Sequence, residues 1–212
     1  DELYGLIHRL QPTCMVGNNH HLDPINGEDF QMFEKDLPGE NRSGLSFQQP
    51  SDAMPLETCE TINDSWGYNV TDRSYKTVKQ VIHLLVNTAG RNTNLLLNVG
   101  PMPNGEIQKE FTDTLLAAGK WLQQYGASIY NTRGKLMPPQ PWGVVTRREK
   151  QVYIHLLNQP QTSFILLPGF NEDIASVAIM GNGKKLKWSK VPEGVFIYHE
   201  YPEQGTVDHV IQ

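Results

Sequence analysis

The sequence predicts an α/β fold over roughly its first two thirds and an all-β fold over the rest. Two observations lead to this prediction. Up to about residue 135, short apolar runs alternate with segments whose apolar residues recur every three or four positions, which is typical of parallel βα units. Beyond about residue 143, runs of alternating apolar and polar residues are separated by turn signals, which is typical of an antiparallel domain.

Composition argues against several classes of protein. The 212 residues are enough for one large domain or two small ones, and 38% hydrophobic with 19% charged residues is typical of a globular chain. The net charge is −5 and the basic residues are not clustered, so no nucleic-acid partner is expected. There is no run of about 18 apolar residues, so we expect no membrane span. Cys14 and Cys59 lie in apolar runs, and we expect two buried free thiols rather than a bridge.

The alternating part contains three predicted helices and three predicted strands. In chain order these are a helix at 2–10, strands at 14–21 and 56–62, a helix at 74–89, a strand at 95–99 and a helix at 108–125. A closed eight-stranded (β/α)8 barrel needs about 250 residues. Three strands therefore predict a part of such a barrel, which needs the other part for closure.

The remaining regions are a long loop and a β-rich end. Residues 22–54 form a polar connection, and connections of this length are commonly functional. A proline-rich linker at 134–143 precedes the short strands of the last third. Their regular spacing predicts an all-β sandwich or a small barrel.

Three segments combine strand-like runs with polar loops. They are GEDFQMFEKDLPGEN (27–41), PLETCETINDSWGY (55–68) and NLLLNVGPMPNGE (94–106). In a parallel barrel, the loops after the strands carry the chemistry. In this order the segments resemble the second half of the catalytic barrel of family 29 glycoside hydrolases, the α-L-fucosidases. The resemblance implies that residues 1–135 are the C-terminal part of a (β/α)8-like catalytic domain and that 136–212 form a β-sandwich domain.

Glycoside hydrolysis uses two carboxyl groups, one of which protonates the leaving oxygen while the other attacks the anomeric carbon or activates water. The resemblance implies a retaining enzyme whose nucleophile is an Asp on the barrel strand before the helix at 2–10. That position lies upstream of this chain. The fragment alone is therefore expected to be inactive.

The general acid/base is expected within the fragment. Asp29-Phe30, followed after three residues by Glu34, resembles the segment that bears this Glu in the family. Glu34 is the first candidate, and Glu40 and Glu57 are the alternatives. From the residues alone, Glu34 is better explained as a solvated loop carboxylate, and only the resemblance makes the catalytic interpretation equally good.

Four further residues are candidates for substrate binding. The resemblance places an aromatic beside the sugar at Trp66, where it would cover the C6 methyl group of fucose; the alternative is core packing. His20 and His21 form the polar end of the strand segment predicted at 14–21, and one of them is a candidate hydrogen-bond partner of substrate. Adjacent strand residues point to opposite faces, so the pair is not expected to bind a metal. Asn98 ends an apolar strand and would orient either the sugar or a neighbouring group.

These features predict an exo-acting retaining glycosidase that releases α-L-fucose from glycans or glycoconjugates without a cofactor. The expected partners are a fucosylated oligosaccharide or glycoconjugate and the N-terminal half of the same barrel. Two alternatives stay open: a glycan-binding or non-catalytic relative, and a retaining glycosidase of other sugar specificity. The compartment is open from the sequence, and the resemblance favours a periplasmic, secreted or lysosomal location over the cytoplasm.

Overall fold

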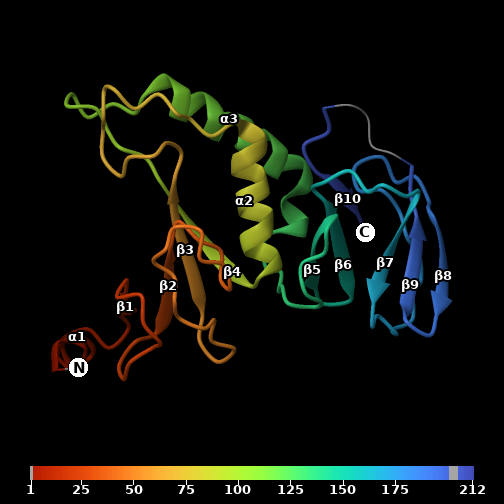
Figure 1. Ribbon diagram of the computed structural model, residues 1–212, viewed down its shortest axis with the longest axis horizontal. Helices are drawn as coiled ribbons and strands as arrows, with labels where there is room; N and C mark the ends of the chain where they lie inside the picture. Colours follow the sequence, from red (N-terminus) through yellow and green to blue (C-terminus); the bar gives the residue numbers. More distant parts are fainter. Residues whose placement is uncertain (1, 201–204) are drawn as a thin grey trace. The chain divides into compact units, whose positions relative to one another are not determined.

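The computed structural model describes residues 2–200 and 205–212, which divide into two compact units (Figure 1). The first unit contains the residues up to Tyr75 and Asn92–Phe111, and the second contains Lys76–Arg91 and Thr112–Gln212. Compact units are defined by contacts and not by independent folding. The predicted division into domains 1–135 and 136–212 therefore stays a prediction.

A parallel sheet forms the centre of the first unit. Its strands are β1 (Gly17–Asn18), β2 (Phe30–Glu34), β3 (Leu56–Thr61) and β4 (Thr93–Asn98), hydrogen-bonded in that order. All three pairings are parallel, so the carboxyl ends of the four strands meet at one edge. This edge carries the polar loops that the sequence singled out.

Strand β2 corrects the prediction that residues 22–54 are a loop throughout. Gln31 and Phe33 are buried while the residues beside them are partly exposed, which is strand alternation. Gln31 obscures the pattern because it is polar. Its buried amide bonds the Gln49 carbonyl and the Ser51 amide, which satisfies its polar atoms.

Helix α1 (Glu2–Leu10) forms as predicted, yet no residue of it is buried. Leu3 is 63% exposed and Leu10 73% exposed, and Leu96 on β4 is 50% exposed. The described residues of the first unit thus leave apolar side chains open to solvent on α1 and β4. Cys14 is also exposed, so the expectation of two buried thiols is wrong for Cys14 and right for Cys59; both are free.

A capping residue sets the start of the first helix of the second unit. Helix α2 (Val78–Gly90) starts after Thr77, whose side chain and that of Gln80 form a capping box, so it begins later than the predicted residue 74. A Cβ on Gly90 would lie 2.4 Å from the Cβ of Val144 in strand β5 (Gly143–Arg148), which shows how closely α2 packs against this strand. Helix α3 (Lys109–Tyr125) is followed by the 3₁₀ turn η1 (Gly126–Ser128).

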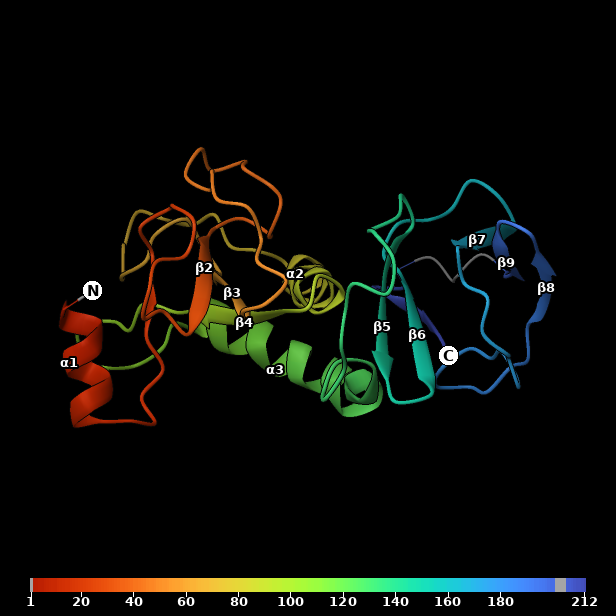
Figure 2. The ribbon, with the colours of Figure 1, turned by 90° about the horizontal axis from the view of Figure 1, so that it is seen from below.

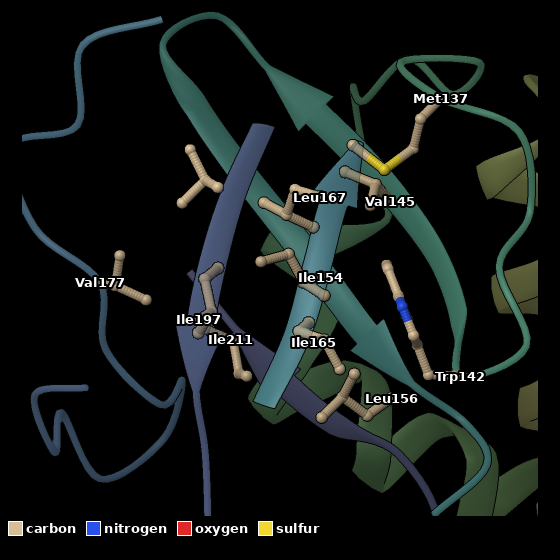
Figure 3. Packing of buried hydrophobic residues seen from close by; sticks show 11 residues of the cluster. Met137, Trp142, Val145, Ile154, Leu156, Ile165, Leu167, Val177, Ile197 and Ile211 are labelled. Atoms are coloured by element: carbon tan, nitrogen blue, oxygen red, sulfur yellow. The ribbon is translucent and has the colours of Figure 1, made fainter. Parts of the chain in front are cut away.

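Two antiparallel sheets complete the second unit. Their strands are β5 (Gly143–Arg148), β6 (Gln151–Leu156), β7 (Phe164–Pro168), β8 (Lys187–Val191), β9 (Gly194–Tyr198) and β10 (His209–Ile211). The sheet orders are β10-β6-β5 and β7-β9-β8, and β5 and β6 run side by side as a hairpin (Figure 2). Both sheets contribute side chains to one apolar core, among them Ile154 from β6 and Ile165 from β7 (Figure 3). The α/β class is therefore confirmed, with a parallel sheet in one unit and antiparallel sheets in the other.

No helix among the described residues is long and apolar enough to cross a membrane.

Candidate active site

The carboxylate of Glu34 is the centre of a polar cluster at the carboxyl edge of the parallel sheet. Asn19 Nδ2 donates a hydrogen bond to Glu34 Oε2 over 2.5 Å, and Trp66 Nε1 donates one to Oε1 over 3.0 Å. His21 Nε2 lies 3.8 Å from Oε2. The Glu34 side chain is 20% exposed. Each oxygen accepts one hydrogen bond, and together these two bonds fix the plane of the carboxylate. Each oxygen also keeps a lone pair that is available to a ligand.

The parallel sheet explains why these residues meet. Glu34 is the last residue of β2 and lies opposite Cys59 on β3. Asn19 directly follows β1, and Trp66 lies in the loop that follows β3. Three neighbouring strands thus bring the residues after their carboxyl ends to one place.

Trp66 has its own supports. Asn98 Nδ2, at the end of β4, donates a hydrogen bond to the Trp66 carbonyl over 2.6 Å. Beyond β4, a Cβ on Gly100 would lie 2.4 Å from the carbonyl carbon of Gly67, so only glycine permits this approach of the two loops. Trp66 is 39% exposed, which leaves indole surface open to a ligand.

The two histidines differ in the partners of their ring nitrogens. His21 has φ 60° and its Nδ1 is buried without a partner among the residues that the structure describes. His20 uses both ring nitrogens inside the protein: Nε2 lies 2.7 Å from Glu28 Oε1, and Nδ1 accepts a hydrogen bond from the Leu22 amide over 3.1 Å. A ligand of His20 would have to replace one of these contacts.

The alternative carboxylates have other partners. Glu40 forms an ion pair with Arg42, with 3.0 Å between Oε2 and Nε. Glu57 lies within β3 opposite Met32, before the end of the strand, and accepts a hydrogen bond from Asn94 over 2.7 Å. Glu34 is therefore the candidate that lies in the cluster with Trp66.

Sequence reasoning missed two residues directly after Glu34. Lys35 Nζ lies 5.3 Å from the centroid of the Trp66 ring, and the residue pattern gives no signal of this contact. Asp36 is buried, and its carboxylate accepts hydrogen bonds from the Arg42 amide (2.9 Å) and from Ser43 Oγ (2.6 Å). Burial alone would raise the pKa of Asp36, but the hydrogen bonds from Ser43 and Arg42 outweigh it and lower the pKa. An Asp before a turn-rich segment is the signal that could have found it.

Cys59 lies opposite Glu34 on β3 and is not a candidate nucleophile. Burial, followed by the negative charge of Glu34, raises the pKa of the Cys59 thiol to about 11. The thiol is therefore protonated and poorly nucleophilic near neutral pH.

Comparison with known proteins identifies the family. Residues 1–127 match the family model described as Alpha-L-fucosidase. The chain belongs to the α-L-fucosidase family. It is 32% identical to the plasma α-L-fucosidase of Homo sapiens over 144 residues, which cover 62% of this chain and 30% of that protein. It is 33% identical to the tissue α-L-fucosidase of Rattus norvegicus over 157 residues, 66% of this chain and 32% of that protein. The chain thus spans about a third of the length of these relatives.

Solved structures of α-L-fucosidases have the same fold. Isoenzyme 1 from Paenibacillus thiaminolyticus superposes on 99% of this chain and 52% of its own, with a TM-score of 0.79 and 30% identity. A family 29 α-L-fucosidase from Bacteroides thetaiotaomicron, solved as a trapped covalent intermediate, covers the whole chain and 51% of its own with a TM-score of 0.80. At 22% identity the second likeness shows the fold alone.

The α-L-fucosidase family is one of glycoside hydrolases. Asn19, Trp66 and His21 contact the Glu34 carboxylate, and none of them is acidic. Glycoside hydrolysis needs a second carboxyl group on the other side of the sugar. No group of three or more metal-ligating side chains occurs among the described residues.

Proposed function

We propose that the chain is the C-terminal part of an exo-acting retaining α-L-fucosidase, which releases α-L-fucose from glycans or glycoconjugates. The observation that carries the proposal is the Glu34 carboxylate, held by one donor on each oxygen at the carboxyl edge of the parallel sheet. Membership of the α-L-fucosidase family indicates that this carboxylate would act in glycoside hydrolysis. Its partial exposure lets it reach a glycosidic oxygen.

The proposed scaffold is the second half of a (β/α)8-like barrel over residues 1–135, followed by a β-sandwich over 136–212. The parallel order of β1 to β4 and the likeness to about half of the Paenibacillus enzyme support this arrangement. The exposed leucines of α1 and β4 support it as well, because the first half of a barrel would cover them. That N-terminal half is the proposed intramolecular partner.

The proposed reaction is a double displacement. An Asp in the upstream half attacks the anomeric carbon while protonated Glu34 donates its proton to the leaving oxygen, which gives a glycosyl–enzyme ester and the free alcohol. Glu34, now ionised, takes a proton from water as that water attacks the same carbon, and fucose and the carboxylate nucleophile are released. The Asp supplies the nucleophile and Glu34 supplies both proton transfers, so no cofactor is required.

The residues around Glu34 are proposed to bind the sugar. The exposed part of the Trp66 indole would contact the C6 methyl group of fucose, where apolar contact is favourable. His21 is the nearer histidine to Glu34, with Nε2 3.8 Å from Oε2, and is the histidine proposed to contact the sugar. Asn98 would contribute indirectly, by holding the Trp66 carbonyl. His20 would also contribute indirectly, because its contact with Glu28 holds the loop after β1.

The proposed substrate is a fucosylated oligosaccharide or glycoconjugate. The relatives named plasma and tissue α-L-fucosidase support a location outside the cytoplasm, whether periplasmic, secreted or lysosomal. Nucleic acid is not a proposed partner, because the net charge is −5.

Hydrolysis of aryl α-L-fucosides by the full-length protein tests the proposal. Wild type is compared with Glu34→Ala on a good and a poor leaving group, with and without azide. We expect Glu34→Ala to lose about a hundredfold or more in kcat/KM on the poor leaving group, less on the good one, and to regain part of its activity with azide. Glu40→Ala is the matched control and should keep wild-type rates.

Each other outcome has a defined meaning. An active wild type with an unaffected Glu34→Ala variant would assign the acid/base role to Glu40 or Glu57. A wild type that is inert on fucosides, yet hydrolyses another glycoside, would indicate another sugar specificity. A wild type that binds fucosylated glycans without cleaving any glycoside would indicate a non-catalytic relative.

A further inference from the structure

Lys35 lies directly after Glu34 in a backbone conformation that lysine rarely adopts. Its φ is 56°, in the left-handed region, and its amide donates a hydrogen bond to the Cys59 carbonyl over 2.8 Å. Non-glycine residues with such a φ persist where the surrounding structure enforces them, and they cluster at functional sites. We therefore ask which side-chain contacts this conformation makes possible.

The left-handed turn brings two consecutive side chains to one indole. In a regular strand, neighbouring side chains point to opposite faces, so Glu34 and Lys35 could not contact the same group. Here Glu34 accepts a hydrogen bond from Trp66 Nε1 at the edge of the ring, and Lys35 Nζ lies 5.3 Å from the centroid of the same ring. The reversal at Lys35 is what makes both contacts possible.

Lys35 also binds the chain that carries Trp66. Its Nζ donates a hydrogen bond over 2.8 Å to the carbonyl of Asp64, two residues before Trp66. The ammonium thus has an oxygen acceptor and an aromatic face, both in the loop after β3, and each contact is favourable for a cation. Trp66 is therefore restrained at three places. Lys35 contacts the ring face, Glu34 accepts the hydrogen bond from Nε1 at the ring edge, and Asn98 binds the backbone carbonyl.

We infer that Lys35 is a positioning residue for the acid/base. It fixes the Trp66 indole so that Nε1–H holds one Glu34 oxygen and directs the carboxyl proton toward the leaving oxygen. The inference rests on the proposed fucosidase function and adds to it a residue that does not touch the sugar. Without the ammonium, the indole would lose its restraint at the ring face and the Glu34 carboxyl group would rotate more freely.

The test compares four lysine variants of the full-length protein on α-L-fucosides with good and poor aryl leaving groups. Lys35→Met keeps the length of the side chain and removes the charge. We expect kcat/KM to fall about tenfold to a hundredfold on the poor leaving group, with a smaller loss on the good one, because only the poor one depends on a well-placed acid. Lys35→Arg keeps a cation and should recover most of the lost rate. Lys79→Met, at an exposed position of α2, is the matched control and should behave as wild type.

Lys35→Gly separates positioning from a purely structural role. Glycine adopts a left-handed φ without penalty, so this variant should melt no lower than Lys35→Met yet show the same loss that depends on the leaving group. Equal losses on both leaving groups, or unchanged rates in Lys35→Met and Lys35→Gly of an active enzyme, would overturn the inference and leave the proposed function intact. A wild type that is inert on every fucoside would overturn the proposed function, and the inference with it.

Discussion

At the scale of single residues, Asp36 makes the loop after β2 sensitive to acid. Its folded pKa is lowered, because hydrogen bonds from Ser43 and Arg42 favour the ionised form more than burial disfavours it. A lowered folded pKa gives stability that is fully present above the unfolded value, about 4. That stability is lost as pH falls below about 4 and through the folded pKa.

The lowered pKa of Asp36 predicts how the stability of Asp36→Asn depends on pH. The amide keeps an acceptor but has no charge, so at pH 7 the free energy of unfolding should fall by about 1–2 kcal/mol. Below pH 4 the stability of the variant should decline less steeply than that of wild type, since the variant has one fewer carboxylate to protonate. Urea melts of the full-length protein at pH 3 to 7 measure both effects. Parallel acid limbs for the two proteins would show that Asp36 does not contribute.

Two residues show why a site is only partly visible in a sequence. Trp66 was identified as a site candidate through the family resemblance, and in the structure its Nε1 lies 3.0 Å from Glu34 Oε1. Lys35 could not be placed beside Trp66, because its contact depends on a φ of 56° that no residue pattern records. Residue types reveal chemistry, whereas the conformations that direct them become visible only in three dimensions.

At the scale of elements, the loop after β4 depends on Gly100. A Cβ there would lie 2.4 Å from the Gly67 carbonyl carbon and 2.5 Å from the Tyr68 nitrogen, and backbone atoms cannot yield as a flexible side chain can. Gly67 is a suitable comparison, since a Cβ on it would have no atom within 4 Å.

Gly100→Ala should therefore displace the loop that carries Trp66. We expect kcat/KM on fucosides to fall at least tenfold and the free energy of unfolding to fall by about 1–3 kcal/mol. Gly67→Ala should change both by much less. The measurements are steady-state kinetics and thermal melts of the two variants beside wild type. Similar behaviour of the two variants would contradict the proposed close contact between the loops.

The periodicity of apolar residues predicted the helices correctly but missed one strand. Helices α1, α2 and α3 follow from apolar residues at steps of three and four, and α2 begins late because Thr77 caps it. Strand β2 was missed because FQMFE places a glutamine on its buried face, where the partners that satisfy the amide come from residues 49 and 51. A buried polar side chain is explained only by its partners, and these are distant in the sequence.

At the scale of the whole molecule, the exposed leucines of α1 and β4 predict how a shortened protein behaves. Residues 1–135 expressed alone should aggregate or bind a hydrophobic dye, because the apolar side chains of Leu3, Leu10 and Leu96 have no cover in the described first unit. The full-length protein, in which the proposed N-terminal half covers them, is the control and should bind little dye. A monomeric 1–135 fragment that melts cooperatively without dye binding would contradict the half-barrel proposal.

The register of the parallel sheet also has a consequence for how activity is lost. Glu34 lies opposite Cys59, and the next residue along β2 is Lys35. A slip of β2 by one residue would exchange a carboxylate for an ammonium at the centre of the cluster and turn every side chain of the strand to the other face. Strand misalignment would thus reverse the local charge before the sheet came apart, so a misfolded protein could retain its strands and still be chemically inert.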